Sequence, residues 1–428
     1  MLKGLVNAFR VKELREKILI TLGILALYRF GAYLPVPGIP FRGMYSAYES
    51  ASSGVGALAI LNLFSGGALS RVSVFALGIM PYITAQIIFQ MMQAVIPSLQ
   101  ALAQEGESGQ RKITQYTRYL TIALALINAI GYLFLFKSSA YGLDFSNIGF
   151  PGWIEDIIIV GTLLTGAILI MWLGEVITQR GIGNGMSLII FVNIMSGLPT
   201  ALIQSVSGSE NGILITAITI LVILVIIPVI VYIERGQRRI PIQYAKRVVG
   251  RRIMGAQATY LPVKVNTAGV VPIIFASAIL YFPAQIAVFF PNVEWMQNFA
   301  NAISTGWINW VLSVLLIVFF AYFYTSMVFN PDETADQLRK SGGFIPGVRP
   351  GAATAAYIKN VLNHITLPGA VFMAIIAVVP SIVFTFTNNG LIQTFGGTSI
   401  LIMVGVAMDT ISSLESQLKM HNYEGFFK

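Results

Sequence analysis

The chain has 428 residues, of which 56% are hydrophobic and only 11% are charged. Soluble domains are typically about 45 to 50% apolar and about 25% charged, so the composition predicts a polytopic membrane protein. The formal net charge is +9, and the sequence has no cysteine, which excludes disulfides, thiolate metal sites and a cysteine nucleophile.

Apolar segments predict ten membrane-spanning helices, because a helix needs about 20 mainly apolar residues to cross the hydrocarbon core. The expected spans cover residues 18–34, 73–96, 117–136, 154–175, 186–205, 213–233, 268–290, 307–329, 367–386 and 398–416. The first is expected to be a retained span. The charged stretch from Met1 to Lys17 precedes it, and no small-residue cleavage site follows it.

Basic residues predict the orientation of these spans, because Lys and Arg near span ends favour the cytoplasmic side. With the N-terminus inside, all but four of the 27 Lys and Arg residues are cytoplasmic. The four exceptions are Arg29, Arg42, Arg71 and Lys137. Both termini are therefore expected in the cytoplasm. Topology also explains the positive net charge, so no direct nucleic-acid role is expected.

The stretch from Asn62 to Pro97 has the pattern of one broken membrane element. Its first part is interrupted by Ser65-Gly66-Gly67 and is too short to span the membrane, so we expect it to insert only half-way. Few large side chains are available to hold it, and its local opening is expected to cost little free energy. From Ser73 onward we expect a full helix.

One face of that helix changes from aliphatic to amide side chains along its length. At about 100° per residue, the stripe contains Ile79, Ile83, Gln86, Gln90 and Gln93. Glutamine is costly against lipid, so the stripe should face protein or water. An aliphatic constriction that opens into a wet funnel explains both parts of the stripe.

Two predicted cytoplasmic segments are longer than a connection between spans requires. Residues 234–265 alternate basic clusters with apolar and β-branched residues, which predicts a projecting hairpin. Residues 330–366 contain two amphipathic turns, separated by Gly342-Gly343 and by a tight loop that carries Arg349. Contact with anionic lipid is one interpretation of such clusters. Arg349 fits a specific partner better, because its loop is rich in Gly and Pro.

A short internal repeat links the two halves of the chain. The stretch from Ala76 to Ile83 aligns with the stretch from Thr267 to Ile274 through the shared pattern Gly-X-X-Pro-X-Ile. Each copy lies in the second span of a set of five. Because five is odd, the two copies run in opposite directions, as expected of an inverted repeat about an axis in the membrane plane.

Several long motifs resemble the SecY family, which supplies the central channel subunit of the bacterial Sec protein translocase. They are VFALGIMPYITAQIIFQMM (Val74 to Met92), MWLGEVITQRGIGNGMSLII (Met171 to Ile190), EGESGQRKITQYTRY, ERGQRRIPIQYAKR, NPDETADQLRKSGGFIPGVRPG and NYEG (Asn422 to Gly425). The resemblance covers essentially the whole chain. It implies an all-α polytopic membrane protein whose ten transmembrane helices form two inverted five-helix halves, residues 1–205 and 206–428, around an hourglass pore.

The resemblance also implies roles for individual residues. A plug would cover about residues 61–72, and a lateral gate would lie between spans 2 and 7. The implied sites are the plug residues Asn62, Leu63, Phe64, Ser65, Gly66, Gly67 and Leu69; the pore-ring residues Ile79, Ile83, Ile190, Ile274 and Ile402; the gate residues Thr84 and Phe282; and the motor or ribosome docking residues Arg238, Arg239, Arg247, Arg251, Arg252 and Arg349.

The partners that the resemblance implies are macromolecules. They are the small membrane subunits SecE and SecG, the SecA motor ATPase, the ribosome, signal sequences and nascent polypeptides, together with membrane lipids. No cofactor and no metal is expected. The expected location is the inner (plasma) membrane of the cell.

The favoured hypothesis is a protein-conducting channel that passes unfolded secretory polypeptides and releases apolar segments sideways into the bilayer. An aliphatic ring suits this substrate, because it closes around any side chain and excludes water and ions at rest. The alternative is a secondary transporter with a five-plus-five inverted repeat. An enzyme is disfavoured, because His364 and His421 are the only histidines and the sequence contains no hydrolase motif.

Overall fold

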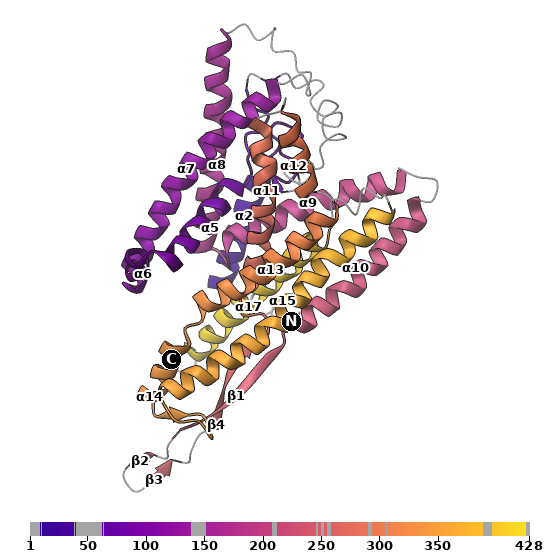
Figure 1. The fold of residues 1–428 in the computed structure, drawn as a ribbon. Helices are drawn as coiled ribbons and strands as arrows, with labels where there is room; N and C mark the ends of the chain where they lie inside the picture. The colour runs from indigo at the N-terminus through magenta and orange to yellow at the C-terminus, as the bar shows by residue number, and fades with distance from the viewer. Residues whose placement is uncertain are drawn as a thin grey trace.

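The computed structural model of the protein describes most of the chain. The described residues are 9, 11–37, 39, 62, 64–137, 151–207, 212–244, 247–249, 252–254, 258–289, 293–304, 306–387 and 396–424. Within them the chain folds as a bundle of helices with a small set of strands projecting from one end (Figure 1).

Each predicted span coincides with one helix of the bundle. These helices are α2 (Lys12–Gly31), α5 (Met80–Val95), α7 (Glu107–Lys137), α8 (Gly152–Arg180), α9 (Gly185–Ser207), α10 (Gly212–Glu234), α11 (Val271–Phe289), α13 (Trp307–Val328), α15 (Ala352–Thr387) and α17 (Gly397–Glu424). Among the described residues, seven helices are long and apolar enough to cross a membrane. The other three helices that coincide with predicted spans are α2, α5 and α11. The prediction of an all-α polytopic membrane protein is confirmed.

Helix boundaries differ from the predicted spans at several places. The helix predicted from Ser73 begins only at Met80, because residues 73–79 form successive turns. Conversely, α7, α8, α15 and α17 continue past the apolar segments into charged sequence. Hydropathy detects only the apolar part of a helix, which is the part expected inside the membrane. A helix satisfies its own backbone, so it continues readily into water.

The two copies of the internal repeat have the same local structure. Gly78 and Gly269 both adopt the left-handed conformation, with φ of +59° and +63°. Each stands two residues before a helix start, and a proline occupies the second helical position. In both copies the residue after the glycine accepts hydrogen bonds from the third and fourth following amides, at 3.1 and 3.2 Å. Glycine is needed there because side chains disfavour that conformation.

Packing of the helices divides the bundle into two groups with limited contact between them. In the first group α5 packs against α7 and α7 against α8; in the second α11 packs against α13, α13 against α15, and α15 against α17. A bidentate ion pair between Arg118 and Glu175, with distances of 2.8 and 2.6 Å, joins α7 to α8. The groups meet where α11 contacts α5 and α7, and where α9 contacts α10 and α17.

The predicted projecting hairpin is present. Strands β1 (Gln237–Tyr244) and β4 (Ala258–Lys264) pair antiparallel, with β5 (Gly343–Phe344) beside β1 and the short pair β2 (Arg247–Val249) and β3 (Arg252–Met254) beyond them. Helix α14 (Pro331–Lys340) packs against α15 and β5. Alternate residues of β1 point inward, and Ile240 and Ile242 pack with Leu338, Ile345 and Ile358 into a separate small core.

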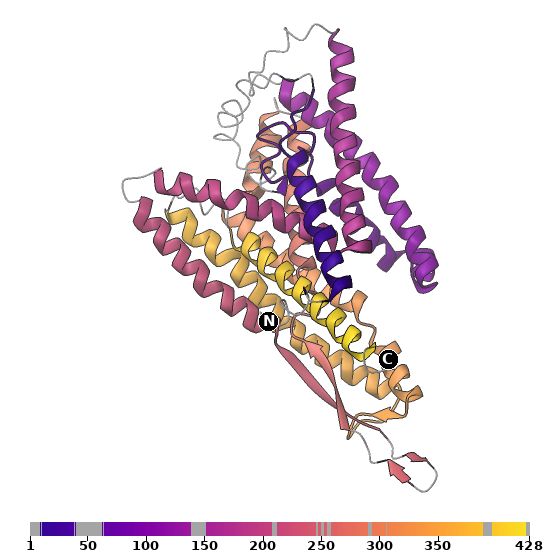
Figure 2. The ribbon, with the colours of Figure 1, turned by 180° about the vertical axis from the view of Figure 1, so that it is seen from behind.

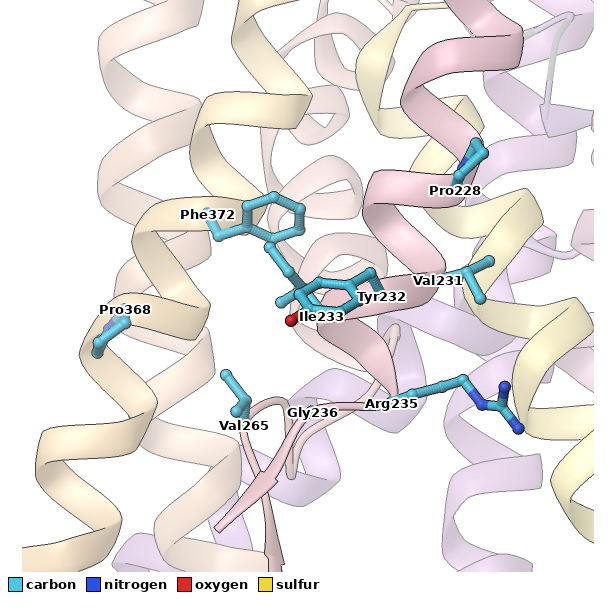
Figure 3. Close-up of a pocket in the computed structure, with 9 residues that line it drawn as sticks. All are labelled: Pro228, Val231, Tyr232, Ile233, Arg235, Gly236, Val265, Pro368 and Phe372. Atoms are coloured by element: carbon cyan, nitrogen blue, oxygen red, sulfur yellow. The ribbon is translucent and has the colours of Figure 1, made fainter.

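Helix α10 forms one edge of the bundle in both views of the fold (Figures 1 and 2). Its apolar side chains are unusually exposed, with Ile213 at 75%, Leu221 at 64% and Tyr232 at 81%. Where α10 meets β1, a cavity of about 820 Å³ opens toward α15 (Figure 3). Its lining consists of Pro228, Val231, Tyr232, Ile233, Arg235, Gly236, Val265, Pro368 and Phe372.

The start of α2 and the end of α17 lie side by side. Leu14 and Ile18 pack with Ile182, Leu414 and Leu418, and Lys17 Nζ donates to Gln417 Oε1 at 3.1 Å. The first and last spans therefore have their outer ends on the same side of the bundle, as an even number of spans requires.

Candidate functional site

The five isoleucines expected to form a pore ring are all buried in the interior of the bundle. They come from four different helices: Ile79 caps α5, Ile83 lies in α5, Ile190 in α9, Ile274 in α11 and Ile402 in α17. All five belong to one apolar cluster, and none is more than 6% exposed. Helices from both groups of the bundle thus contribute aliphatic side chains to one large apolar core, which also contains many residues outside the expected ring.

The stripe along α5 changes in burial as it changes in chemistry. Ile79 and Ile83 are buried, whereas Gln86, Gln90 and Gln93 are half-buried. Gln90 Oε1 is enclosed and has no hydrogen-bond partner among the described groups. The amide part of the stripe is thus less buried than the aliphatic part, although one of its amide oxygens is enclosed.

The segment between residues 62 and 79 folds as a series of turns that its own small polar side chains hold together. Asn62 Oδ1 accepts from the Ser70 amide at 2.9 Å, and Ser65 Oγ accepts from the Leu69 amide at 3.1 Å. Gly66 and Gly67 both have positive φ, at +67° and +82°. These hydrogen bonds satisfy backbone groups of a non-helical segment that is buried among helices, as a hydrocarbon environment demands.

The segment has more buried contacts than the sequence predicts. Phe64, Ala68 and Leu69 are at most 4% exposed, and Phe64 and Ala68 belong to the same apolar cluster as the five isoleucines. The ring of Phe64 also packs edge-on against Tyr281 of α11, with 5.0 Å between ring centroids. Leu63 lies outside the described residues.

Polar side chains of α2 and α9 add a second set of contacts to the segment. Asn193 Nδ2 donates to the Phe64 carbonyl at 2.6 Å, and Tyr28 Oη donates to Asn193 Oδ1 at 2.8 Å. Arg29 Nη1 donates to the Gly66 carbonyl at 2.8 Å. Asn193 and Tyr28 are fully buried, at 0% exposure. Buried hydrogen bonds of this kind are expensive to break, because the separated groups are left without water.

The two residues expected at a lateral gate lie on helices that contact each other. Thr84 is half-buried on α5, where its hydroxyl donates to the Met80 carbonyl at 3.0 Å. Phe282 lies on α11 and is 47% exposed. Because α5 and α11 belong to different groups of the bundle, their contact is one of the boundaries between the groups.

Comparison with known proteins identifies the family. The SecY family model matches residues 73–411. The protein translocase subunit SecY of Mycobacterium bovis is 46% identical over 443 residues, with full coverage of both chains. The chain belongs to the SecY family. The resemblance seen in its motifs is thereby confirmed.

Solved structures show the same fold at low sequence identity. One of them is a SecY structure described by the statement that the plug domain stabilises the closed state of the translocation channel and maintains a membrane seal. It matches with a TM-score of 0.60 and 17% identity, over 94% of this chain and 91% of that one. Sec61 from a canine ribosome–channel complex matches with a TM-score of 0.56 and 16% identity, over the same shares of the two chains. This SecY-family chain is accordingly a multi-pass membrane protein.

The expected docking arginines of this SecY-family chain lie on its projecting end. Arg238 and Arg239 are exposed on β1, and the Arg239 guanidinium lies 4.8 Å from the ring centroid of Tyr260 on β4. Arg349 is exposed in the loop after β5. The backbones of Arg247 and Arg252 form part of β2 and β3, whereas Arg251 lies outside the described residues.

Sequence reasoning missed the residues that hold the 62–79 segment from outside: Tyr28, Arg29, Asn193 and Ser196. A signal was available for one of them. Asn193 stands in an otherwise apolar part of the predicted fifth span, and a polar side chain inside a membrane segment indicates a functional contact by default. Its partner could not be predicted, because Phe64 is 129 residues away in the sequence.

Proposed function

We propose that the protein is a protein-conducting channel that passes unfolded secretory polypeptides across the membrane. The observation that supports the proposal is that Ile79, Ile83, Ile190, Ile274 and Ile402 are all buried in the apolar core that also contains Phe64 and Ala68 of the expected plug. An aliphatic constriction blocked by a small non-helical segment is a closed pore. The blocking segment would be displaceable, because it is not a continuous helix that crosses the bundle.

The ring is proposed to work without chemistry. Aliphatic side chains make dispersion contacts with any side chain and form no specific hydrogen bonds, so they seal around a varying substrate. The half-buried glutamines of α5 would line the wet funnel that leads to the ring. No catalytic residue and no cofactor is assigned.

The lateral gate is proposed to lie between α5 and α11, with Thr84 and Phe282 at its surface. Support comes from the packing: α11 is the helix of the second group that reaches α5 and α7 of the first. Separation of these contacts would open the cluster sideways toward lipid. Signal sequences and apolar segments of nascent polypeptides would leave by this route.

Partners are proposed from the surfaces and the relatives. The strands, α14 and the Arg349 loop would form the cytoplasmic docking surface for the SecA motor or the ribosome, because they carry exposed arginines on a folded platform with its own core. The exposed apolar side of α10 would take a small membrane subunit, SecE or SecG, since so much apolar surface requires lipid or protein cover.

Topology completes the proposal. Residues 1–205 and 206–428 would be the two halves, related by the repeat at the starts of α5 and α11. Both termini and the strand end would face the cytoplasm of a cell whose inner membrane holds the protein, because the basic residues concentrate there.

The test is translocation by the purified chain, assembled with its small subunits in liposomes and driven by the motor ATPase. An unfolded secretory protein should become protected from external protease only when ATP is present. Deletion of residues 62–70 should leave a folded complex that still translocates and that conducts ions at rest in a planar bilayer. Gradient-coupled uptake of one amino acid, sugar or ion by the parent liposomes would instead establish a secondary transporter.

A second experiment tests the gate. The chain has no cysteine, so the double variant Thr84→Cys, Phe282→Cys contains the only thiols, and the two single variants are matched controls. A crosslink between the two positions should block signal-sequence entry. Reduction of the crosslink should restore entry. Normal export by the crosslinked protein would place the gate elsewhere.

A further inference from the structure

Every side-chain hydrogen bond donated to the described plug carbonyls from outside the segment comes from one of two helices, α2 and α9. Asn193 and Ser196 of α9 and Arg29 of α2 are the donors, and the acceptors are the carbonyls of Phe64 and Gly66. Asn193 makes the shortest of these contacts, at 2.6 Å, whereas Ser196 lies at 3.5 Å from the Gly66 carbonyl. The plug is thus tied to α2 and α9.

The orientation of the Asn193 amide follows from its two neighbours. A carbonyl can only accept, so the group that faces Phe64 O must be the donor Nδ2. Its carbonyl Oδ1 then faces Tyr28, whose hydroxyl donates to it at 2.8 Å. Both Asn193 and Tyr28 are fully buried, at 0% exposure, so bulk water does not reach these two hydrogen bonds.

The backbone of the plug is shaped to this amide. A Cβ atom at Gly66 would lie 2.5 Å from Asn193 Oδ1, which is closer than real Cβ atoms approach, and 3.0 Å from Arg29 Nη1, which is a tight contact. Gly66 also has a φ of +67°, which side chains disfavour. Close approach to Asn193 and the left-handed turn therefore impose the same residue.

The contact of the plug with α11, a helix of the second group, is different in kind. Phe64 meets Tyr281 of α11 through an edge-on ring contact with 5.0 Å between centroids. An apolar contact weakens gradually when α11 moves, whereas a buried hydrogen bond has a defined length and breaks at a threshold. Movement of the proposed gate helix would release the ring contact first and leave the plug on α9.

We propose that Asn193 is the positioning residue that holds the plug closed, through its hydrogen bond to the Phe64 carbonyl, and that breaking this bond is the step that frees the plug. The proposal rests on the channel function proposed above. Loss of a buried donor leaves the Phe64 carbonyl unpaired, a change that corresponds to about a tenfold shift of the closed-to-open equilibrium.

The test measures the position of the plug directly. Ala68 is fully buried, and the chain contains no other thiol, so Ala68→Cys reports plug opening through its rate of modification by a water-soluble maleimide in lipid nanodiscs. Added Asn193→Ala should raise this rate about tenfold. Asn193→Leu should raise it at least as much, because leucine has about the size of asparagine and can neither donate to the Phe64 carbonyl nor accept from Tyr28.

The matched control is Asn309→Ala. Asn309 of α13 is half-buried and also donates to a backbone carbonyl, that of Ile303 at 2.8 Å, but it has no part in the plug. In the Asn309→Ala variant, the maleimide should modify the cysteine of Ala68→Cys at the parent rate. A milder variant, Tyr28→Phe, keeps the ring and removes only the hydroxyl that orients Asn193, and should raise the rate about threefold. It provides the measurement should Asn193→Ala fail to fold.

The outcomes separate this proposal from the proposed function. Parent-rate labelling in Asn193→Leu and Tyr28→Phe would overturn the role of Asn193, even if deletion of residues 62–70 makes the channel leak. A deletion variant as silent as the parent would instead overturn the plug itself. Equal increases in Asn193→Ala and Asn309→Ala would show a general loss of stability and would also overturn the role of Asn193.

Discussion

The starts of α5 and α11 have almost identical local geometry but opposite surroundings. Both have a left-handed glycine, a proline in the first turn and the same pair of hydrogen bonds at 3.1 and 3.2 Å. The chain enters α5 from the buried turns of residues 62–79, whereas it enters α11 from strand β4 at the projecting end. The repeat therefore extends to the helix start and stops there.

What differs is the neighbouring atom that a side chain at each glycine would meet. A Cβ at Gly78 would lie 3.2 Å from the Cα of Ser65, in the plug, whereas a Cβ at Gly269 would lie 3.4 Å from Asp409 Oδ2, on α17. In both copies an asparagine amide ties down the entering segment: Asn193 donates to the Phe64 carbonyl, and Asn266 donates to the Gly269 carbonyl and to Glu234. One scaffold thus serves a proposed seal at one end and a docking surface at the other.

The largest effect should come from the equivalent isoleucines of the two copies, Ile83 and Ile274. They are 3% and 6% exposed in the same cluster. Replacement of either by Asn removes buried apolar surface and encloses an amide, which should cost about 3–5 kcal/mol. Both variants should melt at lower temperature and conduct ions at rest in a planar bilayer.

The control for that pair is Ile83→Val and Ile274→Val, each of which should cost only about 0.5–1.5 kcal/mol and leave the resting conductance unchanged. A leak in Ile83→Asn without one in Ile274→Asn would show that the two copies do not contribute equally to the ring.

How far the sequence predicted these features depended on the range of the interactions. Hydropathy placed the helices, and the Gly-X-X-Pro-X-Ile pattern matched two starts of the same geometry, because both depend on local residues. The start of α5 was misplaced by seven positions, since residues 73–79 are apolar in composition yet turn at Gly78. The ties of the plug were missed, because Tyr28, Arg29 and Asn193 are brought to it only by tertiary packing.

The next effect concerns Asn266 and sharpens the contrast with Asn193. Its Nδ2 lies 3.1 Å from both carboxylate oxygens of Glu234 and 2.9 Å from the Gly269 carbonyl. Asn266→Ala leaves these acceptors without their donor, which should cost about 2–3 kcal/mol. Because the contact is remote from the plug, thermal stability should fall while Ala68→Cys labelling and resting conductance stay at parent values. Faster labelling would contradict the division between the two ends.

A smaller effect is expected from the glycines themselves. Alanine at Gly78 or Gly269 must adopt positive φ, at a cost of about 1–2 kcal/mol in each case. Gly78→Ala should cost more of the two, because its Cβ meets plug backbone, whereas the Cβ at Gly269 meets only a carboxylate that can shift. Melting temperatures of the two variants measure the difference. A larger loss in Gly269→Ala would show that the α11 start is the more tightly packed.

The smallest effect on stability is expected from charge reversal at Arg349, on the docking side of the comparison. Its side chain is exposed, and the loop around it is held by backbone contacts: Thr354 Oγ1 donates to the Arg349 carbonyl at 2.9 Å, and the Val348 amide donates to Ile345 at 3.1 Å. Arg349→Glu should therefore change the free energy of unfolding by less than about 0.5 kcal/mol. Motor-driven translocation should nevertheless weaken, because reversed charge opposes an acidic partner and slows its association.

Lys359→Glu is the matched control, since Lys359 is also exposed but lies on α15 outside the loop. Translocation rates at low and high salt give the measurement. An equal loss in both variants would mean that the projecting end attracts its partner only by overall charge.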